Sequence, residues 1–113
     1  MKLGELQKEL ARVALAVLAL AISVTAFASE AVTVVQRDRK FQTKAIEIKA
    51  GDTVRFTNED PFIHHLFAKS ESFSFNSKEQ ETGAPLDVMF PVKGDFEVRC
   101  EIHPKMLLKV HVS

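Results

Sequence analysis

The residues best suited to carry out chemistry lie near the end of the chain, where a thiol, an imidazole and a thioether occur close together. Cys100, His103 and Met106 have the spacing Cys-x-x-His-x-x-Met. A loop of that length can turn all three side chains toward one point. Soft sulfur ligands combined with imidazole suit copper, and two histidines, one cysteine and a weak axial methionine make up the blue-copper ligand set. The segment therefore predicts a site for one copper ion, provided that a second histidine lies nearby.

Two neighbouring histidines are candidates for that second imidazole. His64 and His65 follow the segment 58–63. The residues alone leave the choice between them open. The remaining histidine, His111, falls on the outward face of the last expected strand, so we expect it at the protein surface.

The candidate ligands also have ordinary structural explanations. A single cysteine at the end of a strand is usually a small buried apolar residue, and methionine often fills core space. Cys100, however, is the only cysteine of a chain that we expect to be exported, so it can form no internal disulfide. A metal-bound thiolate explains such an unpaired cysteine better than an inert thiol does.

The segments that must position these side chains have strand patterns. Alternating or β-branched apolar residues predict strands over 31–36, 45–49, 53–58, 86–90, 96–100 and 107–112, with turns at 50–52 and 93–95. Residues 69–84 are polar and weakly patterned, and we expect a loop there with room for one short helical turn. Short strands separated by turns rich in Gly, Pro and Asp predict an all-β fold, either a sandwich or a barrel.

The first 28 residues have the composition of an export signal. Basic residues precede an apolar run over 13–28, which ends in the small-x-small sequence Ala26-Phe27-Ala28. The run is shorter than the roughly 20 apolar residues of a membrane-spanning helix. We expect residues 1–28 to be a signal peptide cut before Ser29, which leaves a domain of residues 29–113 in the periplasm or otherwise outside the cytoplasm. An uncleaved membrane anchor is the alternative, because two glutamates make the N-terminal segment less basic than usual.

The expected domain has almost balanced charge, with 12 Lys and Arg against 13 Asp and Glu over residues 29–113. Because no basic stripe is present, we expect no nucleic-acid partner. We expect a membrane contact only if residues 1–28 stay attached. A domain this small has a marginal core, which a bound metal would help to stabilise. Nothing in the sequence argues for an oligomer, and a monomer is the default expectation.

Two strands and the ligand spacing give the chain a specific resemblance. Residues 50–60, Ala-Gly-Asp-Thr-Val-Arg-Phe-Thr-Asn-Glu-Asp, resemble the strand that leads to the first histidine ligand in the cupredoxin family, the group of plastocyanin, amicyanin and pseudoazurin. Residues 94–100, Gly-Asp-Phe-Glu-Val-Arg-Cys, resemble the family's strand that ends in the cysteine ligand. The short spacing from cysteine to methionine is similar to that of amicyanin. The resemblance covers residues 31–113.

That resemblance implies a Greek-key β-sandwich and a type 1 copper protein that carries single electrons. It assigns the ligands, in the family's order, to His64, Cys100, His103 and Met106. It also implies that His103 is the ligand nearest the surface, surrounded by an apolar patch over which redox proteins dock transiently. The residues able to form this patch are Pro61, Phe62, Ile63, Pro104 and Leu107.

The chain departs from the family directly after two of these ligands. The family usually has Asn after the first histidine and Thr or Ser after the cysteine, and these side chains tie the ligand loops together. The corresponding residues here are His65 and Glu101. Since both positions change to residues that can still bond, we predict an ion pair between His65 and Glu101. Two separately solvated side chains are the alternative.

The residues favour an electron carrier over other classes of protein. A copper chaperone or store that delivers Cu(I) is the alternative function, although such proteins more often have Met-rich or exposed Cys/His clusters. A structural zinc domain would need four strong ligands, and Met106 is a weak one. We see no arrangement for acid–base or nucleophilic catalysis and therefore expect no enzyme activity. A c-type haem would need a Cys-x-x-Cys-His motif.

Overall fold

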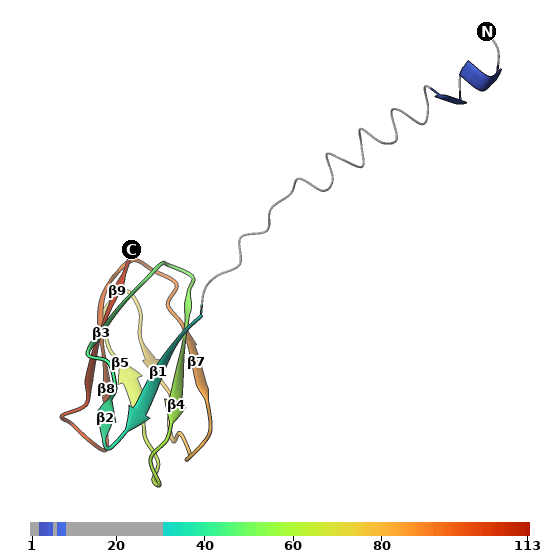
Figure 1. Cartoon of the computed structure of the whole chain (residues 1–113). Helices are drawn as coiled ribbons and strands as arrows, with labels where there is room; N and C mark the ends of the chain where they lie inside the picture. Colours follow the sequence, from blue (N-terminus) through green and yellow to red (C-terminus); the bar gives the residue numbers. More distant parts are fainter. Residues whose placement is uncertain (1–2, 6, 9–30) are drawn as a thin grey trace.

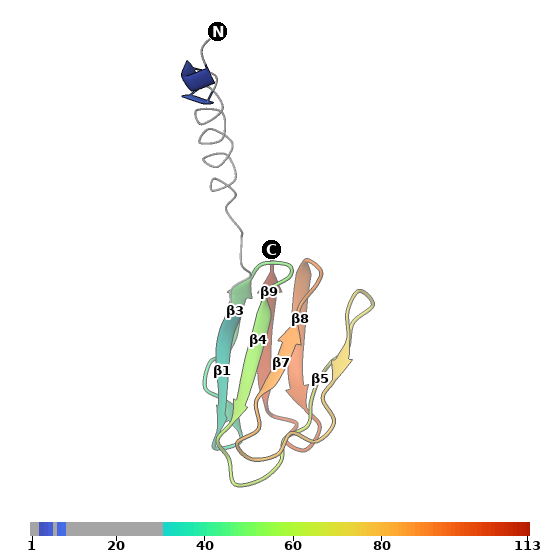
Figure 2. The same cartoon turned by 90° about the vertical axis from the view of Figure 1, so that its right-hand side faces the viewer.

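Two β-sheets packed face to face are formed by residues 31–113. The computed structural model describes residues 3–5, 7–8 and 31–113, and its strands lie in the last of these ranges (Figures 1 and 2). The first sheet has the spatial order β2 (Lys40–Phe41), β1 (Ala31–Arg37), β4 (Thr53–Asn58) and β7 (Leu86–Met89). The second has the order β3 (Ala45–Ile48), β9 (Leu107–Val112), β8 (Gly94–Cys100), β5 (Leu66–Ala68) and β6 (Phe75–Asn76).

The chain crosses repeatedly from one sheet to the other, which confirms the expected all-β sandwich. Strand β1 pairs in parallel with β4, and β3 pairs in parallel with β9, whereas the other pairs are antiparallel. Because β1 and β4 run the same way, Ala31 lies opposite Thr53 at one end of the sheet and Gln36 lies opposite Asn58 at the other. The segments that follow Asn58 and Cys100 both leave the sandwich at this second end.

Alternation along the strands produces the core. In β4, Val54 and Phe56 are buried while Arg55 between them is exposed. In β8, Phe96, Val98 and Cys100 lie on the buried face. Successive side chains of a strand point to opposite faces of the sheet, so the same alternation that buries the core also turns the thiol of Cys100 inward.

The predicted loop over 69–84 is more structured than its composition indicates. It contains the two-residue strand β6 and no helical turn. Phe73 packs against Phe90 and Phe96, with ring centroids 5.3 and 5.7 Å apart, and Phe75 lies 6.3 Å from Phe90. These aromatic contacts fix the segment to the core through only two side chains, which is too few to give a periodic pattern.

Two further details differ from the sequence prediction, and a third prediction falls mostly outside the described residues. Strands β2 and β5 were not predicted, because strands of two or three residues are too short to show alternation. The turn predicted over 93–95 is wrong in part, since β8 begins at Gly94, which pairs with Val112. The predicted signal peptide, residues 1–28, lies largely outside the described residues. Among those that are described, no helix is both long enough and apolar enough to cross a membrane.

Candidate metal centre

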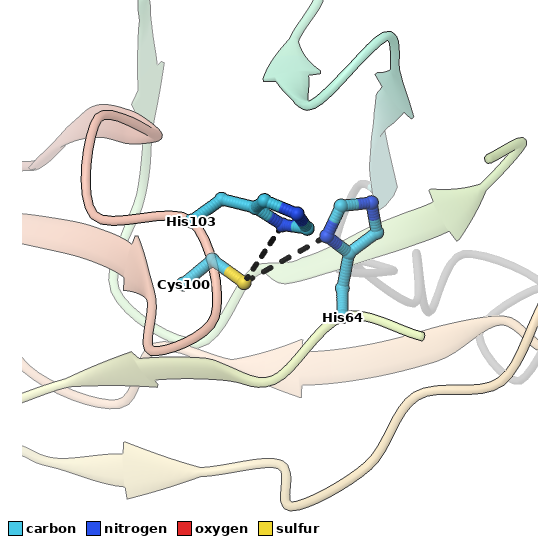
Figure 3. A group of neighbouring side chains, drawn as sticks. All are labelled: His64, Cys100 and His103. Carbon is cyan, nitrogen blue, oxygen red and sulfur yellow. Dashed lines mark hydrogen bonds between the residues drawn. The ribbon is translucent and has the colours of Figure 1, made fainter. Parts of the chain in front are cut away.

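Three of the four predicted ligands converge at one end of the sandwich (Figure 3). Cys100 ends β8, His103 lies in the loop that leads to β9, and His64 lies between β4 and β5. The Sγ atom of Cys100 is 3.7 Å from Nδ1 of His64 and 3.9 Å from Nδ1 of His103. The three donor atoms all lie within 4.8 Å of one another.

This spacing fits a single metal ion. An ion bound at about 2.0 Å to nitrogen and about 2.3 Å to sulfur, as in zinc sites, holds the two atoms about 3.8 Å apart in a trigonal arrangement. The distances of 3.7 and 3.9 Å agree with that value. Two imidazoles with one thiolate are a donor set that suits copper.

The sulfur of Cys100 is buried and held in place by neighbouring backbone. The residue is only 1% exposed, and it pairs with Leu66 across strands β8 and β5. The backbone N–H of His65 donates to its Sγ atom over 3.4 Å. The residue that supplies this N–H directly follows His64, so one short segment positions both the first histidine and the sulfur.

His64 is fully buried and its imidazole is oriented by a carboxylate. The ring nitrogen Nε2 lies 2.8 Å from Oδ2 of Asp60, and His64 is 0% exposed. A carboxylate on one ring nitrogen fixes the proton there and leaves the other nitrogen free to bind a metal. In His64 the free nitrogen is Nδ1, which faces Cys100.

Asp60 joins this histidine to the hairpin between β1 and β2. Its carboxylate also accepts hydrogen bonds from the backbone N–H groups of Asp38, at 2.7 Å, and Arg39, at 3.1 Å. Burial alone would raise the pKa of Asp60, but the hydrogen bond from His64 and the two backbone N–H groups outweigh it and lower the pKa below its usual value. The buried carboxylate is therefore ionised and fully bonded.

The backbone of His64 is fixed from a second direction by Gln80. The two residues exchange backbone hydrogen bonds of 3.0 and 2.7 Å. The buried amide side chain of Gln80 donates to the carbonyl oxygens of Phe56 and Ala84 and accepts a hydrogen bond from Gln36. This buried network connects the first histidine to the core of the first sheet.

His103 has a different setting, because it is only partly buried. Its ring packs against that of Phe62, with centroids 5.3 Å apart, and lies 5.3 Å from the ring of His64. Burial lowers the pKa of His103, and the positive charge of the nearby Arg39 lowers it further. The neutral imidazole, which is the form that binds a metal, is thereby favoured.

Met106, the fourth predicted ligand, lies in the same loop. It is 2% exposed, and its backbone N–H donates to the carbonyl oxygen of His103 over 3.0 Å. Its role as the axial ligand stays a prediction.

The two residues that depart from the family pattern lie together. His65 Nδ1 lies 3.5 Å from Glu101 Oε2, so the two side chains are neighbours, while their ion pair stays a prediction. The other ring nitrogen of His65 contacts Oδ1 of Asn76, and the backbone N–H of Glu101 donates to the carbonyl oxygen of His65 over 2.9 Å. The two ligand loops are thus tied through their backbones by this last hydrogen bond.

Sequence reasoning placed some residues correctly and missed others. His111 lies at the surface as expected, where it contacts Asp95. Ile102, which was not predicted to join the apolar patch, is 44% exposed beside His103. The roles of Asp60 and Gln80 were also missed. An acidic residue four positions before His64 was a usable signal for Asp60, whereas nothing in the polar segment around Gln80 distinguishes it.

Comparisons with known proteins agree with this geometry. The family described as copper-binding proteins of the plastocyanin/azurin family matches residues 28–113. An amicyanin structure from Paracoccus versutus is 28% identical, with a TM-score of 0.68, and the alignment covers 82% of this chain and 88% of the amicyanin. A copper-containing nitrite reductase from Thermus scotoductus is 26% identical, with a TM-score of 0.69 and 80% of this chain covered. The chain spans only 24% of that enzyme's length. A comparison with curated proteins gave no match.

Proposed function

The chain belongs to the plastocyanin/azurin family of copper-binding proteins, and we propose on this basis that it is a type 1 copper electron carrier. Its ligands in this proposal are His64, Cys100, His103 and Met106. The observation that supports it best is the convergence of two Nδ1 atoms on one buried sulfur. When bound there, copper would supply a one-electron Cu(II)/Cu(I) couple.

The surrounding residues suit such a couple because they restrain the ligands. Asp60 and Gln80 hold His64, and the backbone of His65 holds the sulfur of Cys100. Ligands held by the fold change position little when the charge of a bound ion changes, and this keeps the reorganisation on electron transfer small. His103 is the partly exposed imidazole, so electrons would enter and leave through its ring.

The burial of the ligands favours a carrier over a copper chaperone. Handing over a metal ion requires that ligands of the recipient reach it before the donor's ligands release it. Cys100 is 1% exposed and His64 is 0% exposed. A recipient protein would therefore find two of the strong ligands inaccessible, whereas an electron needs only the exposed edge of His103.

We further propose that the protein works outside the cytoplasm as a monomer and has no catalytic activity of its own. Redox proteins would dock transiently over His103, since electron-transfer encounters are typically small and weak. The location rests on the composition of residues 1–28. The N-terminus of the protein isolated from its native cell tests it: a first residue of Ser29 in the periplasmic fraction supports cleavage, and Met1 in the membrane fraction supports an anchor.

The visible spectrum of the chain with Cu(II) is the first test of the carrier. We expect a strong absorption band toward the red end of the visible range, because a thiolate–Cu(II) bond absorbs there, and we expect its loss in Cys100→Ser. If the wild-type chain stays colourless with Cu(II), the carrier proposal is wrong and the chaperone moves ahead.

The axial position is tested by Met106→Leu. The two side chains have similar volume, so the change in stability should stay below about 1.5 kcal/mol. Removing a weak sulfur donor disfavours Cu(II) relative to Cu(I), and we therefore expect a coloured protein with a raised reduction potential. An unchanged midpoint in a redox titration would show that Met106 is a core residue and not a ligand.

A further inference from the structure

An open groove of about 590 Å³ lies beside His103, on the side of the ligand loop that faces β2. Ile102, Pro104 and Leu107 contribute apolar surface to it. The charged residues that line it are mostly positive: four are cationic and one is a carboxylate. They are Arg39, Lys40, Lys44, Lys105 and Asp38. The domain as a whole carries 12 basic against 13 acidic residues over 29–113, so positive charge is concentrated at this groove.

The cations of the groove are also uncompensated. Within residues 31–113, none of these four forms an ion pair with a carboxylate. The other arginines of this range do: each has a carboxylate partner, in the pairs Arg37–Glu59, Arg55–Asp87 and Arg99–Glu97. The groove thus presents charge that the protein does not neutralise itself.

Arg39 brings one of these charges next to the exposed ligand. It occupies a tight turn with Asp38 in which both residues have positive φ angles, 58° and 56°. Such angles are unfavourable for residues other than glycine, and the carboxylate of Asp60 stabilises the turn by accepting both backbone N–H groups. The guanidinium then lies 5.1 Å from the ring centre of Phe62, whose ring packs against His103.

We propose that this basic groove docks a redox protein whose contact face is acidic. The inference rests on the proposed carrier function and adds the charge of the partner. Carboxylates around the partner's cofactor would be drawn to Arg39 and the three lysines, which would bring that cofactor to the edge of His103. Complementary charge raises association rates and sets orientation more than it raises affinity, as a transient electron exchange requires. A second copy of this chain is a poor occupant, because two faces of the same positive charge repel each other.

Electron exchange with small charged complexes tests the docking charge. Hexacyanoferrate(III), a trianion, takes one electron from the reduced protein and becomes hexacyanoferrate(II), and tris(phenanthroline)cobalt(III), a trication, is reduced likewise to cobalt(II). We expect the rate constant for the anion to fall, and that for the cation to rise, as ionic strength increases from about 0.01 M to about 0.15 M and the Debye length shrinks from about 30 Å to about 8 Å.

The double variant Lys40→Glu, Lys44→Glu should lower the rate constant for the anion at low salt by about tenfold or more. Neither residue belongs to a ligand loop, so the visible band should not change. The matched control is Lys49→Glu, Lys93→Glu, which alters net charge equally at the other end of the sandwich, beside the C-terminal residues of β9. An equal loss of rate in both double variants would show an effect of net charge only and would overturn the proposal.

A second measurement does not depend on copper. Backbone amide NMR of the full copper-free chain, titrated with an oligoglutamate peptide, should show shifts at residues 38–44 and 102–107 that disappear in the groove variant and persist in the control. Shifts spread evenly over all exposed lysines would overturn the proposal. A second result would also overturn it: the peptide causes no shifts at the groove, but the chain binds phosphatidylglycerol vesicles in a salt-sensitive way and the groove variant does not. The occupant of the groove would then be a membrane surface. Absence of the visible band in the wild-type chain would instead reject the carrier function itself.

Discussion

The two histidines of the candidate centre present the same atom, Nδ1, to the same sulfur, yet the fold supports them differently. His64 is 0% exposed, bonds to a buried carboxylate and exchanges two backbone hydrogen bonds with Gln80. His103 is partly exposed, and the contacts of its ring are with the rings of Phe62 and His64. One imidazole is thus part of the core network, and the other is part of a short surface loop.

In the proposed carrier, this difference separates two tasks of the metal site. A ligand fixed by buried hydrogen bonds keeps the coordination geometry constant, because a change at that position would break several of them. A ligand with a free edge gives a partner access to the metal without opening the protein. The following predictions test this division, beginning with the largest expected effect.

Replacement of each histidine by glycine should separate the two positions most clearly. Both His64→Gly and His103→Gly should lose the visible copper band, since each removes a strong ligand. Added imidazole should restore the band in His103→Gly, because that position opens to solvent, and should fail in His64→Gly, where the core covers the vacated space. The measurement is the absorption spectrum during an imidazole titration. Equal recovery of the band in both variants would mean that the positions of His64 and His103 are equally accessible to imidazole.

Asp60→Asn should weaken the buried hydrogen-bond network that fixes His64. The carboxylate accepts hydrogen bonds from two backbone N–H groups and from His64, and an amide can accept through only one of its two polar atoms. Leaving buried donors without partners should lower the free energy of unfolding by about 2 kcal/mol or more, as measured by urea denaturation of the copper-free chain.

Glu59→Gln is the matched control, because it removes the neighbouring carboxylate in an exposed pair with Arg37. Exposed ion pairs contribute little, and we expect a change below about 1 kcal/mol. Similar losses in the two variants would show that Asp60 acts as an ordinary surface carboxylate.

The smallest effect is expected at His111 and Asp95, which form a histidine–carboxylate contact of 2.6 Å like that of His64 and Asp60, but at the surface. The hydrogen bond and charge of Asp95 raise the pKa of His111. The pair therefore stabilises the folded chain below the ordinary histidine pKa of about 6.5, and this contribution is lost as pH rises through the raised value. Asp95→Asn should lower Tm slightly at pH 5.5 and leave it unchanged at pH 8.5. A pH-independent shift would contradict this assignment.

The sequence was sufficient to predict the long strands and the convergence of three candidate ligands, His64, Cys100 and His103. Strands β4 and β9 have the predicted bounds. Each has six residues, which is long enough for the alternation of apolar and polar side chains to be recognised in the sequence. Cys100 at the end of β8 and His103 in the loop that follows are three positions apart, so their proximity follows from local spacing. The choice of His64 over His65 needed a family resemblance. Both residues lie in a loop, where the alternation of side chains along a strand does not predict which one points inward.

The parts that sequence reasoning missed depend on contacts between distant segments. Gln80 is a polar residue within a polar stretch, and its buried position arises from pairing with His64 and from hydrogen bonds to Phe56 and Ala84. The basic groove combines the β1–β2 turn with the ligand loop more than 60 positions later. Neither segment alone has an unusual charge, so the cluster becomes visible only when the two are brought together.

The direction of β1 determines which end of the sandwich any attachment before Ala31 would hold. The strand enters the sandwich at Ala31, beside Thr53, and its seven residues run toward the end where the ligands lie (Figure 1). Seven extended residues span on the order of 20 Å. An attachment before Ala31 would therefore hold the domain by the end opposite His103. If the proposed carrier were retained at a membrane, it would diffuse over a shorter distance, while the face proposed to dock redox proteins would be the same as in a form cleaved before Ser29.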